Sequence, residues 1–483
     1  MPKTPAIIIE TPNLGGIADS PYQGIKHSLA SIVGFDLHSI PGVLLVNQKL
    51  TIESGAPTDD VYKIVPCSDG NIYFFGQTTG NVWKKSSGVY SSLGTVSPAA
   101  GSAAILDAIE YNGFIYYAMG QRLGQWNFAA AFSTRNDNFG TFTNGSTSYH
   151  PMYFLPNAQY IFIGDGNVVA QVDNTNTFTA SALNTIAKNL TVTALSSQGS
   201  DLLIGASTLN NVALSFVLRW NTWSTTPTYA YPIREAVVNA FIPLDSTVVI
   251  NAGLSGNLYQ LDGTGSFFQK LKQIPPIFPN TYSPTNTVVV NYPAVANKQG
   301  IPLFGVSNTG GNVALQGVYS FGSRNVSYPT ILTLEFPVST GNFTNISIWS
   351  IATSGNDIYV SSHDTGAGTF QIDKLDWSNK YSGAYFETLI IKYSRVWLDN
   401  FDKFITNLAQ TLPANTQVNV SYKINGGSYV AWTQGTDLLS DTDRNSVTAD
   451  RRVDARTLQF KVQITTSGNN APIIEDFIIL LNG

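Results

Sequence analysis

The sequence predicts an all-β protein: a seven-bladed β-propeller with an N-terminal extended arm and a C-terminal β-sandwich. A short apolar burst recurs along the middle of the 483-residue chain, and each burst is followed by a second strand with alternating polarity. The composition agrees, because 41 glycines and 12% aromatic residues are typical of many short strands joined by tight turns.

The apolar bursts set the repeat. Each is nearly all apolar and ends in Gly or a small residue, which predicts a strand buried on both faces. Successive bursts end 41 to 57 residues apart, at Gly76, Gly120, Gly164, Gly205, Gly253, Gly305 and Ser362. Strand pairs at this spacing match the four-stranded blades of a propeller, and seven bursts predict seven blades over residues 41–384.

Each burst is followed by a strand that opens with Gly, Asn or both, as in TGNVWKK, DGNVVAQVD and SGNLYQLDG. Gly and Asn tolerate the positive φ that a tight turn requires. The apolar spacing is not helical, which excludes a helical solenoid of similar period. A row of separate β-sandwiches is the remaining alternative, and the period suits it poorly.

A propeller has to close its ring. The strand GVLLVNQKLTI, residues 42–52, precedes the first burst and has no repeat partner of its own. We expect it to complete the last blade beside residues 369–377, because joining the two ends removes an open sheet edge.

The two ends of the chain differ from the middle. Residues 1–40 are rich in Gly, Pro and Ser and predict an extended arm, with one short helix near residues 27–32. Residues 385–483 contain longer alternating strands and the turn signal KINGGSY, which predict a separate sandwich.

Composition excludes several functions. The net charge is −5 and no Lys/Arg run exceeds two residues, so we expect no direct sequence-specific nucleic-acid binding. Cys67 is the single cysteine, which rules out a disulfide within the chain and predicts a buried strand thiol. No apolar stretch is long enough for a membrane helix, and we expect no membrane span.

No catalytic, cofactor or metal motif is present. The four histidines show no metal-ligand spacing, and neither a nucleophile elbow nor a phosphate-binding loop occurs. We therefore expect no cofactor and no enzyme activity. The stretch SHDTGAGTF, residues 362–370, resembles the Asp box of sialidase-like propellers, in which the Asp stabilises a turn rather than acting in catalysis.

Four residues are candidates for contact with a ligand or partner. Trp220 and Trp223 flank a polar turn in RWNTWSTTPTYAYP and could stack on sugar rings. Arg451 and Arg452 lie in the densest charged stretch, residues 441–456, which predicts a solvated loop or a polar subunit contact.

Several stretches together resemble virion proteins of tailed bacteriophages. They are the opening arm NLGGIADSPYQGIKHSLASIVGFDLHS, the blade DGNIYFFGQTTGNVWKKSSGVYSSLGTV, the propeller of similar repeats, and the ending RTLQFKVQITTSGNNAPIIEDFIILL. In short-tailed phages, propeller proteins form the nozzle or the plug below the portal. The resemblance implies a non-enzymatic structural protein of the tail or the head-to-tail neck, made in the host cytoplasm and assembled into the virion.

The expected partners are copies of the chain itself and other virion proteins. Low charge and abundant Asn, Thr and Ser suit a protein buried in such contacts, and the arm would order on a neighbour. Two alternatives stay open. One is a tail component that binds a host receptor or surface glycan, and the other is a propeller-type glycan hydrolase.

Overall fold

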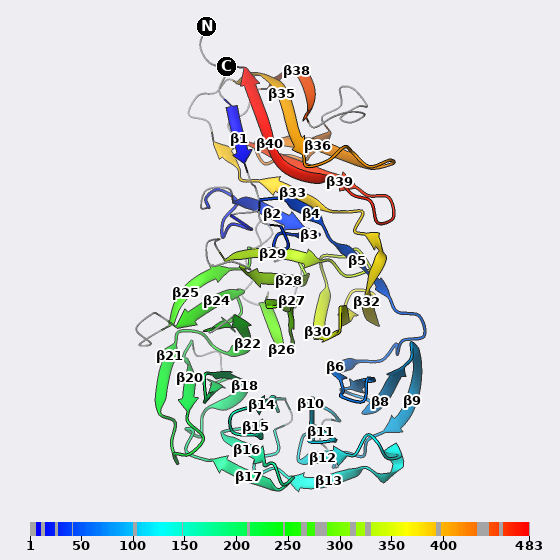
Figure 1. The fold of residues 1–483 in the computed structure, drawn as a ribbon. Helices are drawn as coiled ribbons and strands as arrows, with labels where there is room; N and C mark the ends of the chain where they lie inside the picture. The colour runs from blue at the N-terminus through cyan, green and yellow to red at the C-terminus, as the bar shows by residue number, and fades with distance from the viewer. Residues whose placement is uncertain are drawn as a thin grey trace. The chain divides into compact units, whose positions relative to one another are not determined.

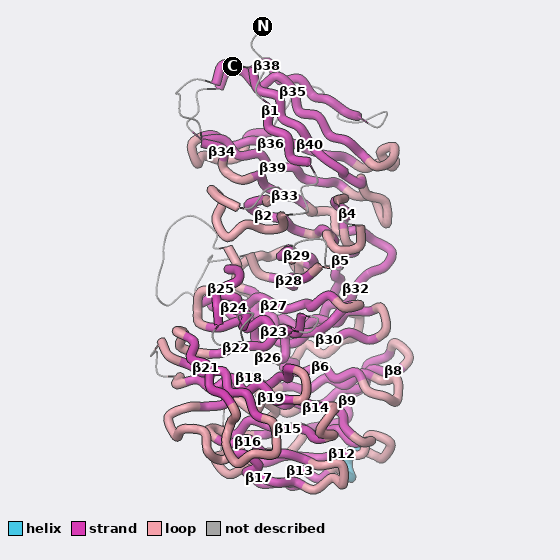
Figure 2. Tube along the Cα trace, turned by 60° about the vertical axis from the view of Figure 1, so that its left-hand side comes forward, coloured by secondary structure: helices cyan, strands magenta, loops and turns pink. Residues whose placement is uncertain are grey.

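The computed structural model describes residues 6–10, 15–24, 28–40, 42–99, 104–146, 148–209, 213–244, 247–261, 268–275, 287–309, 315–323, 330–392, 398–431, 444–453 and 457–482. Strands and turns make up nearly all of this part of the chain (Figure 2), with one short 3-10 helix, η1, at Phe132–Thr134. The predicted all-β fold is confirmed: the chain contains a β-propeller.

Two compact units divide the chain, and we describe each by itself. The propeller unit comprises Ile52–Gln316 and Asn342–Lys374. The terminal unit comprises Met1–Thr51, Gly317–Gly341 and Leu375–Gly483. This division differs from the three consecutive segments that we expected, 1–40, 41–384 and 385–483.

Within the described residues, six antiparallel sheets have four strands each. The first three consist of β6 (Val61–Pro66), β7 (Ile72–Gly76), β8 (Asn81–Ser86) and β9 (Val89–Thr95); β10 (Asp107–Tyr111), β11 (Phe114–Met119), β12 (Arg122–Trp126) and β13 (Asn136–Thr141); and β14 (Met152–Leu155), β15 (Tyr160–Asp165), β16 (Val168–Val172) and β17 (Phe178–Leu183).

The other three consist of β18 (Thr191–Gln198), β19 (Asp201–Ser207), β20 (Ser215–Trp220) and β21 (Tyr229–Ile233); β22 (Val238–Leu244), β23 (Thr247–Ala252), β24 (Asn257–Leu261) and β25 (Phe268–Gln273); and β30 (Ile346–Ser354), β31 (Asp357–Asp364), β32 (Thr369–Lys380) and β5 (Gln48–Ile52). The antiparallel pair β26 (Thr287–Lys298) and β27 (Ile301–Thr309) also belongs to the propeller unit.

The first strands of these sheets form a closed ring (Figure 1). β6, β10, β14, β18, β22, β26 and β30 contact one another in that order, and β30 contacts β6 again. The expected closure is confirmed, because β5 lies beside β32 and the Glu53 N–H donates to the Ile372 carbonyl oxygen at 2.9 Å. The number of complete blades stays a prediction.

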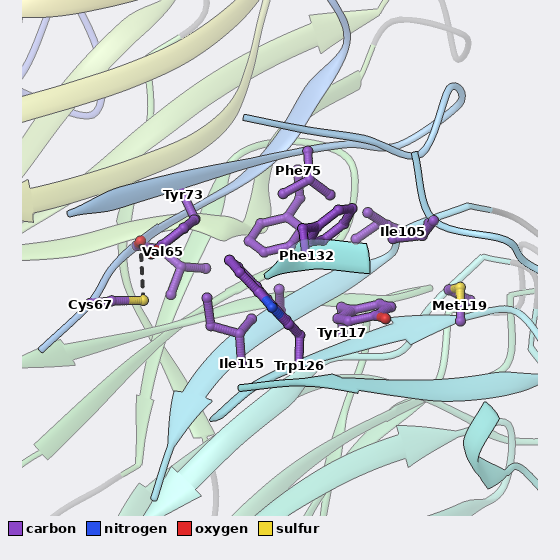
Figure 3. Packing of buried hydrophobic residues seen from close by; sticks show 13 residues of the cluster. Val65, Cys67, Tyr73, Phe75, Ile105, Ile115, Tyr117, Met119, Trp126 and Phe132 are labelled. Atoms are coloured by element: carbon purple, nitrogen blue, oxygen red, sulfur yellow. Dashed lines mark hydrogen bonds between the residues drawn. The ribbon is translucent and has the colours of Figure 1, made fainter. Parts of the chain in front are cut away.

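Apolar clusters between neighbouring blades hold the ring together. Figure 3 shows the cluster between the β6–β9 and β10–β13 blades, where Trp126 packs edge-on against Tyr73 and Phe132, with ring centroids 5.4 and 5.1 Å apart. Cys67 lies in this cluster and its thiol donates to the Val65 carbonyl oxygen at 3.7 Å. The predicted buried thiol is confirmed, and burial raises its pKa.

Buried polar side chains add a second link between blades. In each case a side chain of one blade accepts the backbone N–H of the next first strand. The pairs are Asp107 with Met152 (2.8 Å), Ser207 with Val238 (2.9 Å), Asn251 with Val290 (3.0 Å), Ser307 with Ile348 (2.8 Å) and Ser350 with Ile64 (3.1 Å).

A buried ion pair closes the seam between the first and last blades. Lys85 is 6% exposed, and its ammonium lies 2.7 Å from Glu53 and 3.1 Å from the Tyr359 hydroxyl. The same ammonium lies 5.2 Å from the centroid of the Tyr90 ring. Lys85 is the last residue of the motif TGNVWKK. One residue of the repeat motif therefore forms the ion pair between the first and last blades.

The terminal unit is built from both ends of the chain and one internal segment. One sheet has the order β3-β4-β40-β35-β38 with β1 on β40, and in a second, β28, β29, β2, β33, β39, β36 and β37 follow one another, with β34 on β39. The bounds are β1 (Ala6–Glu10), β2 (Leu29–Val33), β3 (Phe35–Asp36), β4 (Leu44–Val46), β28 (Gly317–Gly322), β29 (Ile331–Phe336), β33 (Tyr385–Thr388), β34 (Ile391–Lys392), β35 (Leu398–Leu408), β36 (Gln417–Ile424), β37 (Val430–Ala431), β38 (Arg444–Val453), β39 (Thr457–Thr465) and β40 (Ile473–Asn482).

The N-terminal segment is therefore not an arm over a surface. β2 lies between β29 and β33, and Leu29, Ile32 and Val33 have no exposed area. The expected helix near residues 27–32 is also wrong from residue 29 onward, because β2 is a strand there. Its apolar side chains supply part of the core that the C-terminal strands need.

Candidate functional site

One face of the propeller unit gathers the turns that join first to second and third to fourth strands. The strands of each blade run antiparallel in chain order, so these turns lie at the same end of every blade. The face carries Trp223, in the turn between β20 and β21, and a groove between two neighbouring blades. We take it as the candidate site.

Trp223 is 87% exposed. The side-chain oxygen of Asn221 holds its turn, because it accepts the backbone N–H groups of Trp223 and Ser224 at 3.0 and 2.9 Å. Tyr229, which begins β21, is 54% exposed, and its ring stacks on Tyr231. The turn is therefore fixed while the indole stays in solvent.

Trp220 does not belong to this surface, and its prediction as a contact residue is wrong. It is 2% exposed, its ring lies 5.5 Å from that of Phe162, and its indole N–H donates to the Ser224 carbonyl oxygen at 2.7 Å. The signal was present in the sequence. Neighbouring side chains of a strand point to opposite faces, so Trp220 lies on the same face of β20 as the buried Leu218 and on the opposite face from Arg219.

Arg451 and Arg452 lie on β38, which pairs with β35, so residues 444–453 are a strand and not the loop that we expected. Their side chains lie outside the described residues. The two arginines belong to the terminal unit, whereas Trp220 and Trp223 belong to the propeller unit.

The groove on the same face was not found from the sequence. It has a volume of about 470 Å³ and is lined by Glu110, Tyr111, Asn112, Phe154, Pro156, Gln159 and Asn174. The rings of Tyr111 and Phe154 lie 5.3 Å apart, and the Tyr111 hydroxyl donates to the Gln159 carbonyl oxygen. Burial, together with Asp173 and Tyr160, raises the pKa of Tyr111.

Aromatic side chains also meet on the inner strands of the ring. The Tyr62 ring lies 6.2 Å from Tyr292 and 5.9 Å from Trp349, and the Tyr292 hydroxyl donates to the Leu106 carbonyl oxygen. Burial raises the pKa of Tyr62 and of Tyr292. These phenols stay neutral and act as packing groups.

The turn that resembles an Asp box behaves as predicted. Asp364 ends β31 and accepts the backbone N–H groups of Gly366 and Ala367 at 2.9 and 3.0 Å. Burial alone would raise the pKa of Asp364, but hydrogen bonds from Ala367, Asn342 and Gly366 lower it below its ordinary value. The carboxylate is a turn-stabilising group.

The described residues contain neither a metal-binding cluster nor a membrane-spanning helix. No group of three or more His, Cys, Asp or Glu side chains there could hold a metal ion. The described part of the chain also contains no helix with the length and apolar character needed to cross a membrane.

These features define a β-propeller protein with a second β-rich unit. No protein-family model and no curated protein matches the chain. Solved structures similar to it include a virginiamycin B lyase from Staphylococcus aureus, with 10% identity and a TM-score of 0.46 over 68% of this chain and 99% of that one.

A chain of the mitotic checkpoint complex is also similar, with 11% identity and a TM-score of 0.44 over 68% of this chain and 91% of that one. The extracellular domain of a hybrid two-component system from B. thetaiotaomicron has 13% identity and a TM-score of 0.45 over 83% of this chain. The present chain spans 47% of that protein's length.

Proposed function

We propose that the chain is a non-enzymatic structural protein of a tailed-phage virion, placed in the tail or the head-to-tail neck. It assembles through contacts with copies of itself and with other virion proteins. The resemblance of its repeats and ends to such proteins supports this proposal. The structural observation that carries it is the exposed Trp223 on the turn-bearing face of the propeller.

An indole that is 87% exposed can bury a large apolar area when it packs into an interface. Tryptophan is enriched among the residues that dominate binding energy, and truncating such a residue costs about 2 kcal/mol or more. The Asn221 hydrogen bonds fix the turn beforehand, so little backbone entropy is lost on association. The few charged residues of the chain, 12%, leave a surface suited to contacts between subunits.

The test is assembly of the purified chain into particles. We expect Trp223→Ala to lower incorporation by at least about tenfold, the change that a loss of about 1.4 kcal/mol produces. Trp377→Ala is the matched control, because Trp377 is 49% exposed and lies in the terminal unit. A wild-type protein that stays monomeric and never co-purifies with virions would refute the proposal.

A second function is receptor binding, with Trp223 stacking on a host surface glycan. The same exposed indole favours it, since its free face can pack on the C–H groups of a sugar ring. Retention of the chain on host glycans, abolished by Trp223→Ala while particle incorporation persists, would favour this function over scaffolding.

A further inference from the structure

The groove between the β10–β13 and β14–β17 blades combines two aromatic rings with amide side chains. The rings are those of Tyr111, which ends β10, and of Phe154 in β14. The amides include Gln159, in the turn between β14 and β15, and Asn174, in the turn between β16 and β17. Its volume of about 470 Å³ is large enough to take a small ligand or a long side chain.

Hydrogen bonds between the two blades fix the walls of the groove. The Tyr111 hydroxyl donates to the Gln159 carbonyl oxygen. The Asn112 side-chain amide donates to the Asn174 carbonyl oxygen at 3.3 Å. Walls that are linked in this way before a ligand arrives lose little conformational freedom when it binds.

The amide side chains of Gln159 and Asn174 are free to bind a ligand. Both residues are exposed, and neither side chain makes a hydrogen bond within the described part of the chain. The φ of Gln159 is 56°, a left-handed conformation that favours glycine. The fold alone therefore does not explain a glutamine at this position, whereas a contact made by its side chain would.

The groove is acidic. None of its lining residues is Lys, Arg or His, and Glu110 is one of them. The two carboxylate oxygens of Glu110 accept hydrogen bonds from the Ser68 N–H, at 2.8 Å, and from the Ser68 hydroxyl. These bonds position the carboxylate but leave its charge uncompensated, because Glu110 forms no ion pair among the described residues.

Asp173 adds a second negative charge at the rim. Its carboxylate accepts the Thr177 N–H at 2.8 Å, and this bond holds the pKa of Asp173 below its ordinary value. Burial and then Asp173 raise the pKa of Tyr111, so the field of this carboxylate reaches the groove. Lys84 of the neighbouring blade lies elsewhere, 5.9 Å from the Tyr73 ring centroid, where it interacts with Asp69.

This chemistry favours a guanidinium group over other ligands. Its planar cation stacks on aromatic rings, and its five N–H donors match carboxylate and amide oxygens. A quaternary ammonium offers no donor, and a lysine ammonium has no planar face. A neutral sugar would leave the Glu110 charge uncompensated, and phosphates or acidic sugars would be repelled by it.

We propose that this groove binds an arginine side chain presented by a partner protein. The guanidinium packs against the Tyr111 and Phe154 rings and donates to the Glu110 carboxylate and the Gln159 side-chain oxygen. Charge complementarity is the reason for choosing a basic protein segment as the occupant. The site goes beyond the proposed structural role, since it defines the chemistry of one partner contact and does not require Trp223.

The experiment measures binding of the purified full chain to a fluorescein-labelled peptide, Gly-Ser-Gly-Arg-Gly-Ser-Gly with a blocked C-terminus, by fluorescence anisotropy. Two matched peptides carry citrulline or lysine in place of the arginine. Citrulline keeps the shape of arginine but has no charge. We expect the arginine peptide to bind at least about tenfold more tightly than the citrulline peptide, and more tightly than the lysine peptide.

Glu110→Gln is the decisive variant, because it removes the charge and keeps an acceptor for Ser68. We expect it to weaken binding of the arginine peptide by about tenfold. Asp357→Asn is the matched control, since it removes a carboxylate from β31 in the last blade and should leave the affinity unchanged.

Gln159→Gly separates binding from folding. Glycine adopts a φ of 56° without strain, so we expect an equal or higher unfolding temperature together with weaker binding of the arginine peptide. A purely structural role of the Gln159 side chain would instead lower the unfolding temperature.

Equal affinity for the arginine and citrulline peptides, or unchanged affinity in Glu110→Gln, would overturn the proposal. A lysine peptide that binds as tightly as the arginine peptide would overturn the choice of a guanidinium. Peptide binding is measured on the purified chain and particle incorporation on virions, so failure of one proposal is distinguishable from failure of the other.

Discussion

At the residue scale, the glycines that end the apolar bursts have a cause that the sequence does not indicate. Gly164, Gly205 and Gly305 lie within strands, not in turns. A Cβ on Gly205 would lie 2.6 Å from a methyl carbon of Val238, and one on Gly305 would lie 2.2 Å from Ile348. Glycine at these positions leaves room for a side chain of the first strand of the following blade.

Gly205→Ala tests this close approach. We expect it to destabilise the chain by about 1–3 kcal/mol, since the new methyl overpacks a closed interface. The measurement is chemical denaturation, and the control is a double-mutant cycle with Val238→Ala, which removes the nearest methyl carbon. Additive effects of the two substitutions would mean that the close approach is not the reason for the glycine.

Asp364 gives a pH-dependent test. Its folded pKa lies below the unfolded value of 3.8, so the ionised carboxylate contributes stability that is fully present above pH 3.8 and is lost as the pH falls through the folded value. We expect Asp364→Asn to cost about 1 kcal/mol at neutral pH. The difference from wild type should vanish in acid. A difference that stays constant down to pH 2 would contradict this assignment.

At the element scale, the links between blades explain why the ring stays closed. Five of the first strands, β6, β14, β22, β26 and β30, receive a side-chain hydrogen bond from the preceding blade, through residues such as Ser207 and Ser307. The Lys85–Glu53 pair adds a charged contact at the seam. Removing one partner of such a buried pair leaves an uncompensated charge in a poorly solvated place.

Lys85→Ala should therefore destabilise the propeller unit by about 3–5 kcal/mol. Lys374→Ala is the matched control, because Lys374 pairs with Asp357 at 3.0 Å but is 30% exposed, and exposed pairs contribute at most about 1 kcal/mol. Urea denaturation measures both. If the two substitutions had equal effects, the seam would owe its stability to packing alone.

The sequence predicts the repeat, the strand pairing and the ring closure well, because these depend on local polarity and spacing. The burst-and-turn pattern is visible within a few residues, and the strand at 42–52 stood out because it had no local partner. Prediction from the sequence fails where the structure of a segment depends on pairing with a distant part of the chain. Nothing near Leu29 indicates that Phe386 will lie across from Ile32, so β2 reads as an arm.

The candidate site shows the same limit. Trp220 and Trp223 are three residues apart, yet one is 2% and the other 87% exposed. Strand alternation could have separated them. The Tyr111–Phe154 groove could not be read from the sequence, because it joins residues from different blades whose neighbourhood only the folded chain defines.

At the scale of the whole molecule, the terminal unit is a composite. β4 and β1 pair with β40, and β2 pairs with β33, so the C-terminal strands share two sheets with the N-terminal segment. A fragment of residues 385–483 would expose the apolar edges and faces that these strands cover.

We therefore expect the isolated fragment 385–483 to lack a cooperative unfolding transition, whereas the full chain unfolds cooperatively. Circular dichroism and differential scanning calorimetry distinguish the two. Adding a peptide of residues 1–51 to the fragment is the informative control, since partial recovery of structure would show that the missing strands are the cause. A fragment that folds cooperatively alone would restore the separate sandwich that the sequence predicted.

The pairing of Ala6 with Leu480 has a consequence for synthesis. A ribosome releases the first strand of the terminal unit long before it makes the last one, and loop closure over such a separation is slow. The blades, each made of consecutive strands, can assemble as they emerge. The nascent chain thus carries an unpartnered apolar segment until β40 has been synthesised, which makes the strands before the propeller the part most in need of a chaperone.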